Sequence, residues 1–178
     1  IPLRLVGSEM CIRDRIMDIV KKRTPTWLPG VPTLYQKIMD AAEEKDVDLS
    51  GIRNAFSGAA TLPVEIVERW EALTGGRLVE GFGMTETSPV LTANPMNGKH
   101  RPGYVGVPFP DTEVRIANPE NLDETQPDGQ PGEMLARGPQ IFQGYFGNAA
   151  ATEKTFHNGW FRTGDMAVSY THLRAHET

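Results

Sequence analysis

The chain has 178 residues, of which 39% are hydrophobic and 23% are charged, a composition typical of a folded globular protein. Its net charge of −5 argues against binding nucleic acid through a basic surface, and its one cysteine excludes an internal disulfide and a multi-cysteine metal site. No hydrophobic run approaches the roughly 18 residues that a membrane-spanning helix needs.

The two ends of the chain differ in character from the rest. Residues 5–15 read LVGSEMCIRDR and residues 168–178 read VSYTHLRAHET, and neither stretch has a clear periodicity. With suitable codons, the complement of the DNA that encodes the first stretch encodes Val168–Glu177, as one adapter joined to both ends of a DNA fragment would give. Both stretches resemble a translated transposase-type sequencing adapter. We therefore expect residues 1–15 and 168–178 to be non-native.

Helices and strands alternate through the first half of the remaining chain. Their predicted boundaries rest on apolar spacing, on proline at helix starts and on glycine at helix ends. In chain order we expect the end of a helix at Ile16–Lys22, a proline-punctuated loop, a helix that starts near Pro32, a strand at Arg53–Ser57, a helix at Pro63–Leu73 and a strand at Arg77–Glu80.

Shorter strands and more turns are expected in the second half. Strands are predicted at Thr112–Ala117 and Glu133–Arg137, a polar connection at Asn121–Gly132 and a short helix at Ala150–Phe156. This order favours an α/β fold, with an α/β layer followed by a small β subdomain.

Two glycine-containing segments, Gly58-Ala59-Ala60 and Gly81–Thr87, directly follow predicted strands. Ligands of open α/β sheets lie beyond the carboxyl ends of strands, so both segments are candidate site loops. In the second, glycines on both sides of Phe82 allow close approach to a flat ligand, and Thr85 and Glu86 offer oxygen atoms to a phosphate and its divalent cation. The alternative is an ordinary surface turn.

Further along the chain, Asp165 follows a Thr-Gly pair after a predicted strand, where its carboxylate could accept hydrogen bonds from a ribose diol. Alone, this tripeptide is more typical of a simple turn. Two more glycine-containing stretches, Gly132–Gly138 and Gln143–Tyr145, lie before it. The segments therefore form an ordered set, which is more specific than any one of them.

This ordered set resembles the adenylate-forming acyl-CoA synthetase superfamily, most closely the long- and medium-chain fatty-acid–CoA ligases. The matching stretches are Ser57–Pro63, Gly81–Pro89, Gly103–Pro108, Gly132–Tyr145 and Trp160–Asp165. The resemblance runs from about Ile16 to Ala167. It identifies residues 16–167 as a partial AMP-binding domain, belonging to the large N-terminal domain of these enzymes.

The resemblance implies a role for each candidate residue. Thr85 and Glu86 would be the catalytic residues, Glu86 by binding Mg²⁺ that bridges ATP phosphates and Thr85 by a hydrogen bond to the α-phosphate. Val31 and Met84 would border the acyl pocket, with core packing as the alternative for both. The backbone of Gly58 and Ala59 would line the adenine pocket, and Asp165 would bind the ribose. Phe82 would stack on adenine, at a position where the family more often has Tyr. The residues assigned to the nucleotide are Gly58, Ala59, Gly81, Phe82, Gly83, Thr85 and Asp165.

The implied reaction joins a fatty acid to CoA in two steps with ATP, through an acyl-adenylate. Its substrates would be ATP, the fatty acid and CoA, with AMP as a product and Mg²⁺ offsetting the phosphate charge. The resemblance implies a cytoplasmic enzyme and leaves peripheral membrane contact open, since fatty acids are amphiphiles. An aryl-acid ligase or a peptide-synthetase adenylation domain is an alternative, and a non-catalytic nucleotide-binding module is an alternative of another class.

Two parts of the resembling enzymes have no match in this sequence. One is the upstream Ser/Thr/Gly-rich phosphate loop, and the other is the C-terminal domain with its adenylation lysine. Missing N-terminal and C-terminal parts of the same enzyme are therefore expected partners, and the 178-residue chain alone is expected to be inactive.

Overall fold

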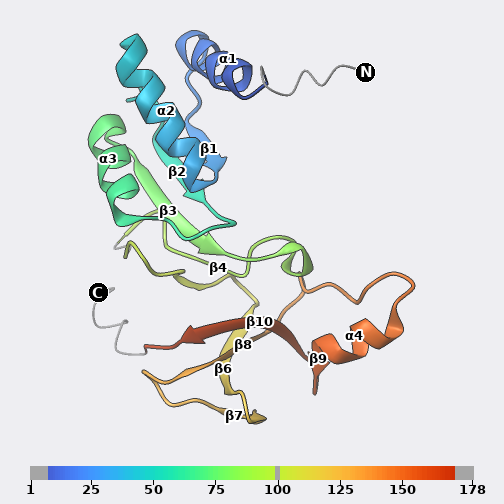
Figure 1. Ribbon diagram of the computed structural model, residues 1–178. Coiled ribbons are helices and arrows are strands. Elements are labelled where there is room, and N and C mark those ends of the chain that lie inside the picture. The colour runs from blue at the N-terminus through green and yellow to red at the C-terminus, as the bar shows by residue number, and fades with distance from the viewer. Residues whose placement is uncertain (1–7, 99–100, 171–178) are drawn as a thin grey trace. The chain divides into compact units, whose positions relative to one another are not determined.

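The computed structural model describes residues 8–98 and 101–170, with side chains described from residue 15 onward (Figure 1). The chain divides into two compact units, one made of Ile1–Gly81 and Asn94–Gly106 and the other of Phe82–Ala93 and Val107–Thr178. The first unit combines helices with a parallel sheet and the second is mainly β-structure. This confirms the predicted α/β class and the order of its two parts.

Parallel strands and three helices build the first unit. β1 pairs with β2, and β2 pairs with β3, so β2 is the middle strand of the three. The second pairing runs from Asn54↔Arg77 to Ser57↔Glu80. The elements are α1 (Ser8–Lys22), β1 (Trp27–Gly30), α2 (Pro32–Lys45), β2 (Asn54–Ser57), α3 (Val64–Thr74) and β3 (Arg77–Phe82), the last residue of which belongs to the second unit.

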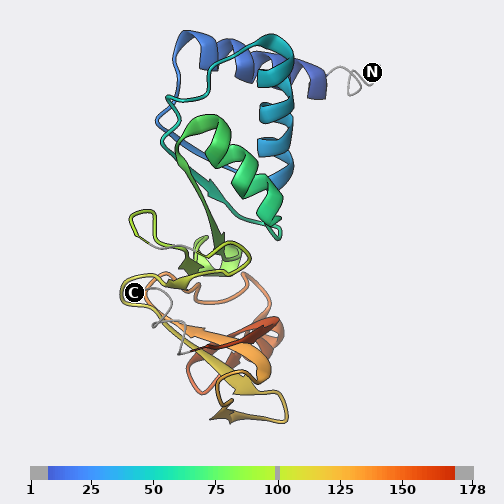
Figure 2. The same ribbon diagram turned by 90° about the vertical axis from the view of Figure 1, so that its left-hand side faces the viewer.

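One hydrophobic core joins these helices to the sheet. Tyr35 and Ile38 of α2 and Val67 and Trp70 of α3 are buried together with Leu78 of β3. The rings of Tyr35 and Trp70 meet edge-on, with 4.9 Å between their centroids. Figure 2 shows α2 and α3 side by side against the strands. The face of the sheet beneath them is therefore the buried one.

The predicted ends of the two amphipathic helices are confirmed. Pro32 occupies the first turn of α2, where the missing N–H of proline costs no hydrogen bond. Gly75 ends α3 in the left-handed conformation, with φ at 63°, and its N–H donates to the carbonyl of Glu71. None of the helices in the described part of the chain is both long and apolar enough to cross a membrane.

The loop predicted between α1 and α2 is wrong in one respect, because Trp27–Gly30 forms strand β1. This segment contains Pro29, which has no N–H and reads as a loop residue in a sequence. Within the described ranges, β1 is the first strand in the sheet order and pairs with β2 alone, so an N–H is not needed on its other side. An edge strand tolerates proline for this reason.

Tyr35 links β1 to β2 through its side chain. Its buried hydroxyl lies 2.9 Å from the carbonyl oxygen of Leu28 and 2.7 Å from that of Phe56. Because Tyr35→Phe leaves both carbonyls without this donor, we expect a loss of about 1–3 kcal/mol in the free energy of unfolding, measured by urea titration. The matched control is Tyr145→Phe at an exposed hydroxyl, expected to stay within about 0.5 kcal/mol of the wild type. Equal stability of the two variants would contradict the bridging role.

Antiparallel β-structure forms the second unit. Its larger sheet has the order β7-β6-β8-β10-β9, and β4 pairs with β5. Leu91, Ile116, Met134 and Phe161 are buried between these elements. The elements are η1, a short 3-10 turn (Thr85–Thr87), β4 (Thr92–Ala93), β5 (Val107–Pro108), β6 (Glu113–Asn118), β7 (Asn121–Thr125), β8 (Pro131–Arg137), α4 (Ala149–Thr155), β9 (Phe156–His157) and β10 (Trp160–Val168).

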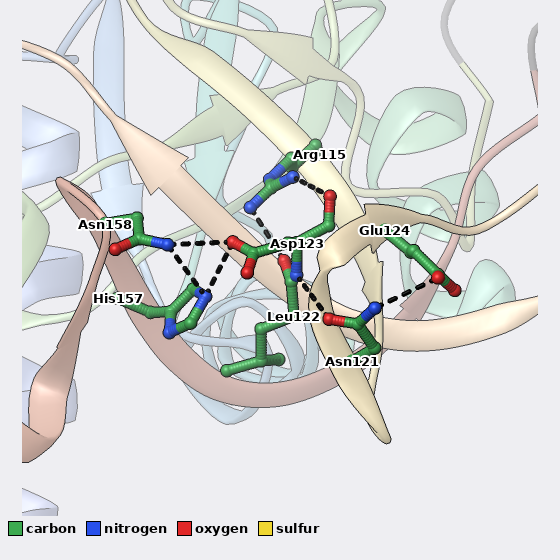
Figure 3. Close-up of polar contacts among 7 residues, drawn as sticks. All are labelled: Arg115, Asn121, Leu122, Asp123, Glu124, His157 and Asn158. Carbon is green, nitrogen blue, oxygen red and sulfur yellow. Dashed lines mark hydrogen bonds and ion pairs between the residues drawn. The ribbon is translucent and has the colours of Figure 1, made fainter.

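Strands β6 and β8 and helix α4 confirm the predictions to within one or two residues, but Asn121–Thr125 was expected in a polar connection and forms strand β7. Polar contacts, rather than burial, hold this exposed strand (Figure 3). The Asp123 carboxylate accepts hydrogen bonds from His157 at 2.8 Å and Asn158 at 2.9 Å, and these lower the pKa of Asp123. Arg115 of β6 donates to the Asp123 carbonyl. Hydrophobic periodicity could not indicate a strand of this kind.

Candidate active site

Gly58 and Ala59 lie in the loop that follows the carboxyl end of β2, where the sequence placed them. The Gly58 N–H donates to the Gly30 carbonyl at 3.2 Å, which extends the contact between β1 and β2 by one residue. Ala59 is exposed and has a φ of 66°, in the left-handed region. Because residues with a side chain rarely adopt this conformation, the loop is strained at a residue assigned to the nucleotide.

The other two predicted residues of the first unit differ in burial. Gly81 is buried in β3, close to the carboxyl end of that strand. Val31 precedes the first turn of α2 and is 40% exposed, so it does not belong to the hydrophobic core. Its side chain is therefore available to a ligand.

A cavity of about 680 Å³ in the first unit is lined by none of the predicted site residues. Asn54 and Arg77, which line it, are the first residues of β2 and β3, so it opens at the amino ends of these strands. Ligands of open α/β sheets bind at the opposite ends. The predicted residues of this unit, Gly58, Ala59 and Gly81, lie instead at or just after the carboxyl ends of β2 and β3.

In the second unit, the buried Thr87 hydroxyl shapes the loop that follows β3. It accepts a hydrogen bond from the Met84 N–H at 2.9 Å and lies 3.0 Å from the carbonyl oxygens of Met84 and Pro89, either of which can accept its proton. This closes the short turn Thr85–Thr87. Sequence reasoning gave Thr87 no role, because the typical capping signal has Ser or Thr at the start of the turn and Glu or Gln three residues later, whereas this turn has Met84 and Thr87 at these positions.

Gly83 is packed against the chain's own backbone. A Cβ atom at this position would lie 1.9 Å from the carbonyl oxygen of Pro89 and 2.8 Å from the Cα atom of Val90. Gly83 has no positive φ, so conformational freedom does not explain the glycine. The structure thus gives a folding reason for a residue that was predicted to approach the nucleotide.

Glu86 borders a cavity of about 230 Å³ in the second unit. The Tyr145 hydroxyl donates to Glu86 Oε1 at 2.7 Å, and this contact raises the pKa of Tyr145. The Phe142 N–H donates to the Glu86 carbonyl at 2.9 Å, so the segment after β8 holds both ends of this residue. The cavity is lined by Met84, Glu86, Glu133, Tyr145, Lys154, Thr155, Phe161, Arg162, Thr163 and Gly164.

An ion pair inside this cavity was missed by sequence reasoning. Arg162 donates from Nε to Glu133 Oε1 at 3.1 Å and from Nη2 to Oε2 at 2.8 Å, which raises the pKa of Arg162. Glu133 is only 7% exposed, and a bidentate pair of this kind fixes both side chains. Both residues lie in stretches that carried the resemblance, but no local pattern indicates that they meet.

Thr85, Met84 and Asp165 differ in how they meet this cavity. Met84 lines it and also packs against the hydrophobic core of the second unit, so core packing is confirmed for this residue and its place at the border of the acyl pocket stays a prediction. Thr85 and Asp165 are exposed and are not among its lining residues. Asp165 lies within β10, at the irregular register between Arg162 and Met166, rather than beyond the end of a strand as predicted.

A magnesium ion fits the donor set of this cavity. Mg²⁺ is commonly held by one or two carboxylates together with substrate phosphates, and Glu86 supplies a half-buried carboxylate there. In residues 8–98 and 101–170, no three His, Cys, Asp or Glu side chains gather into a cluster that could hold a metal ion. Glu86 would therefore share the ion with phosphate oxygens rather than enclose it.

Comparison with known proteins places this geometry in context. The family model described as AMP-binding enzyme matches residues 4–146. A long-chain-fatty-acid–CoA ligase of Bacillus subtilis is 41% identical over 166 residues, and a feruloyl-CoA synthase of an Amycolatopsis species is 35% identical over 154 residues. The crystal structure of the anthranilate CoA ligase AuaEII in complex with anthranoyl-AMP superposes with a TM-score of 0.81 at 26% identity.

These matches cover most of this chain but a minor part of each relative. They include 90%, 86% and 90% of this chain, and 30%, 31% and 30% of the Bacillus, Amycolatopsis and AuaEII proteins. The chain thus spans about a third of the length of the proteins it matches.

Proposed function

Because the chain belongs to the family of AMP-binding enzymes, we propose that it is part of an AMP-forming ligase that joins a fatty acid to CoA. One observation carries this proposal: the Glu86 carboxylate is held at a cavity by Tyr145, in a chain 41% identical to a long-chain-fatty-acid–CoA ligase. The acid, ATP and CoA are the proposed substrates. Adenylate formation fits the relative that was crystallised with anthranoyl-AMP.

The proposed reaction has two displacement steps, and one leaving group departs in each. A carboxylate oxygen of the acid attacks the α-phosphorus of ATP, the bond to the β-phosphate oxygen breaks, and pyrophosphate leaves. The CoA sulfur then attacks the acyl carbonyl carbon, AMP leaves, and the thiol proton is released. When bound, Mg²⁺ neutralises phosphate charge, so that catalysis depends mainly on position and electrostatics.

The residues of this chain would bind and orient the nucleotide. We propose that the backbone at Gly58 and Ala59 receives adenine, that Phe82 stacks on its ring and that Asp165 accepts hydrogen bonds from the ribose. Thr85 would donate to the α-phosphate, and Glu86 would hold Mg²⁺. The strained backbone at Ala59 and the hydrogen-bonded carboxylate of Glu86 support two of these roles.

Aryl acids are the second candidate substrates. The feruloyl-CoA synthase match and the anthranilate CoA ligase structure support them, at 35% and 26% identity against 41% for the fatty-acid ligase. Both classes undergo the same two steps, so the acid pocket decides between them. We propose Val31 and Met84 as its border.

The test uses the full-length enzyme, recovered by sequencing the source DNA outward past codons 15 and 168. We expect thioester formation from palmitate with release of AMP and pyrophosphate, and lower kcat/KM with ferulate or benzoate. Activity only with aryl acids would assign the second class, and AMP release with neither would overturn the ligase proposal. The 178-residue chain alone serves as a control and should form no thioester. A genomic frame that keeps residues 1–15 and 168–178 would overturn their proposed adapter origin.

Tyr145→Phe tests whether the hydroxyl positions Glu86. Loss of one charge-assisted hydrogen bond is expected to raise the Mg²⁺ concentration at half-maximal rate in the full-length enzyme about 3- to 10-fold. The Tyr145 side chain is 40% exposed, so the unfolding midpoint should not change. An unchanged Mg²⁺ dependence would show that Glu86 needs no support from Tyr145.

A further inference from the structure

Glu80 is a buried acid in the first unit with no role in the reaction described above. It lies in β3, is 5% exposed, and pairs in register with Ser57 of β2. Its Oε1 atom accepts a hydrogen bond from the Leu62 N–H at 3.0 Å. Among the described residues, neither Glu80 Oε2 nor Ser57 Oγ has a hydrogen-bond partner, although both atoms are buried.

The hydrogen bond to Leu62 fixes the far end of the loop that contains Gly58 and Ala59. At the near end, the Gly58 N–H donates to the Gly30 carbonyl. At the far end, the Leu62 side chain is buried in the core and its N–H is held by Glu80. Between these two points Ala59 keeps its left-handed conformation, which persists only when the surrounding structure enforces it.

The Glu80 backbone holds a second loop of the same unit. Its carbonyl accepts a hydrogen bond from the Asn94 N–H at 2.9 Å. The Asn94 side-chain amide in turn donates to the carbonyls of Arg101 and Tyr104. Glu80 therefore contacts the Gly58–Leu62 loop through its side chain and the segment that begins at Asn94 through its backbone.

We propose that Glu80 is a positioning residue, whose side chain holds the Gly58–Leu62 loop in the shape that receives the adenine ring. This inference rests on the proposed function, because the adenine assignment does. Glu80 touches no reacting atom. It acts through the loop backbone and the strained Ala59.

The charge state of Glu80 selects the variant that should preserve this role. Burial raises the pKa of the Glu80 carboxyl, partly offset by the Leu62 N–H, so the neutral acid is favoured relative to an exposed glutamate. A glutamine has the same shape, keeps the acceptor for Leu62, and offers an N–H in the direction of the other oxygen. Methionine has similar length and no acceptor.

The experiment compares Glu80→Met and Glu80→Gln in the full-length enzyme. With one buried hydrogen bond lost, E80M should raise KM for ATP about tenfold with little change in KM for the acid, and E80Q should remain within about twofold of the wild type. Amide hydrogen exchange at Leu62 should be faster than in the wild type in E80M but not in E80Q. Wild-type KM for ATP in E80M, or wild-type exchange at Leu62, would overturn the proposal.

Glu71 provides a matched control. Its Oε1 atom accepts a hydrogen bond from the Leu78 N–H at 3.2 Å, near the amino end of the same strand and away from the Gly58–Leu62 loop. Glu71→Met should lower the unfolding midpoint without changing KM for ATP. An equal rise in KM in E71M and E80M would show a general loss of stability and overturn the positioning role.

Two further outcomes are separable. If E80M does not fold, Glu80→Asp shortens the side chain by one methylene, and unchanged KM and exchange in that variant would overturn the proposal. If the wild-type enzyme forms no acyl-CoA, the proposed function fails. Wild-type exchange at Leu62 in the variants would then refute the loop contact as well, whereas faster exchange would keep the contact and remove only its adenine role.

Discussion

Glu86→Gln is expected to lower kcat/KM for ATP in the full-length enzyme by about 100-fold, the effect of weakening a carboxylate that holds a metal ion. Glutamine keeps the shape of the side chain and can still accept the Tyr145 hydrogen bond, so the loop should retain its structure. It lacks the negative charge that Mg²⁺ prefers in a ligand. The Mg²⁺ concentration at half-maximal rate should therefore rise as well, measured by pyrophosphate release against a magnesium titration.

Glu153→Gln is the control for this variant. Glu153 is an exposed residue of α4 in the same unit, and it undergoes the same chemical change without lining the cavity. Its kinetics should stay within about twofold of the wild type. If E86Q keeps the wild-type Mg²⁺ dependence, Glu86 is not a metal ligand, even if its rate is reduced.

Sequence periodicity predicted the elements that bury an apolar face. Helix α3 and strand β3 are of this kind, and Gly75 marks the end of the helix because only its conformation permits the chain to turn there. β1 and β7 were missed for opposite reasons. Pro29 is typical of a loop, so its sequence did not predict the edge strand β1. Polar contacts hold Asn121–Thr125, and such contacts leave no hydrophobic pattern in the sequence.

The sequence predicted which loops carry the candidate site residues, but it did not predict the contacts that these residues make. Gly58, Ala59 and Glu86 follow strands in the sequence, and the structure places them at the carboxyl ends of β2 and β3 or in the turn after β3. Tyr145 reaches Glu86 across 59 positions of the chain, a distance at which no spacing rule applies. Likewise, the sequence offers no local signal that Glu80 accepts a hydrogen bond from Leu62.

Gly83→Ala is expected to destabilise the second unit by at least about 3 kcal/mol, because the added methyl group meets backbone atoms rather than a mobile side chain. The Pro89 carbonyl would lie 1.9 Å from the new Cβ atom, so either the turn that carries Glu86 or the segment around Pro89 has to move. Activity would be lost through the fold whether or not Gly83 contacts the nucleotide. Urea unfolding of Gly83→Ala is therefore the measurement that tests this loss of stability.

Gly58→Ala is the control for Gly83→Ala. The same methyl group would lie 3.8 Å from the Phe56 ring and 3.9 Å from the Gly81 carbonyl oxygen, which are ordinary contact distances, and Gly58 has no positive φ. Its unfolding free energy should stay within about 1 kcal/mol of the wild type. If both variants unfold at the wild-type midpoint, the close approach of Gly83 to Pro89 is not rigid. In that case Gly83 would return to its first interpretation, a glycine kept for the approach of the nucleotide.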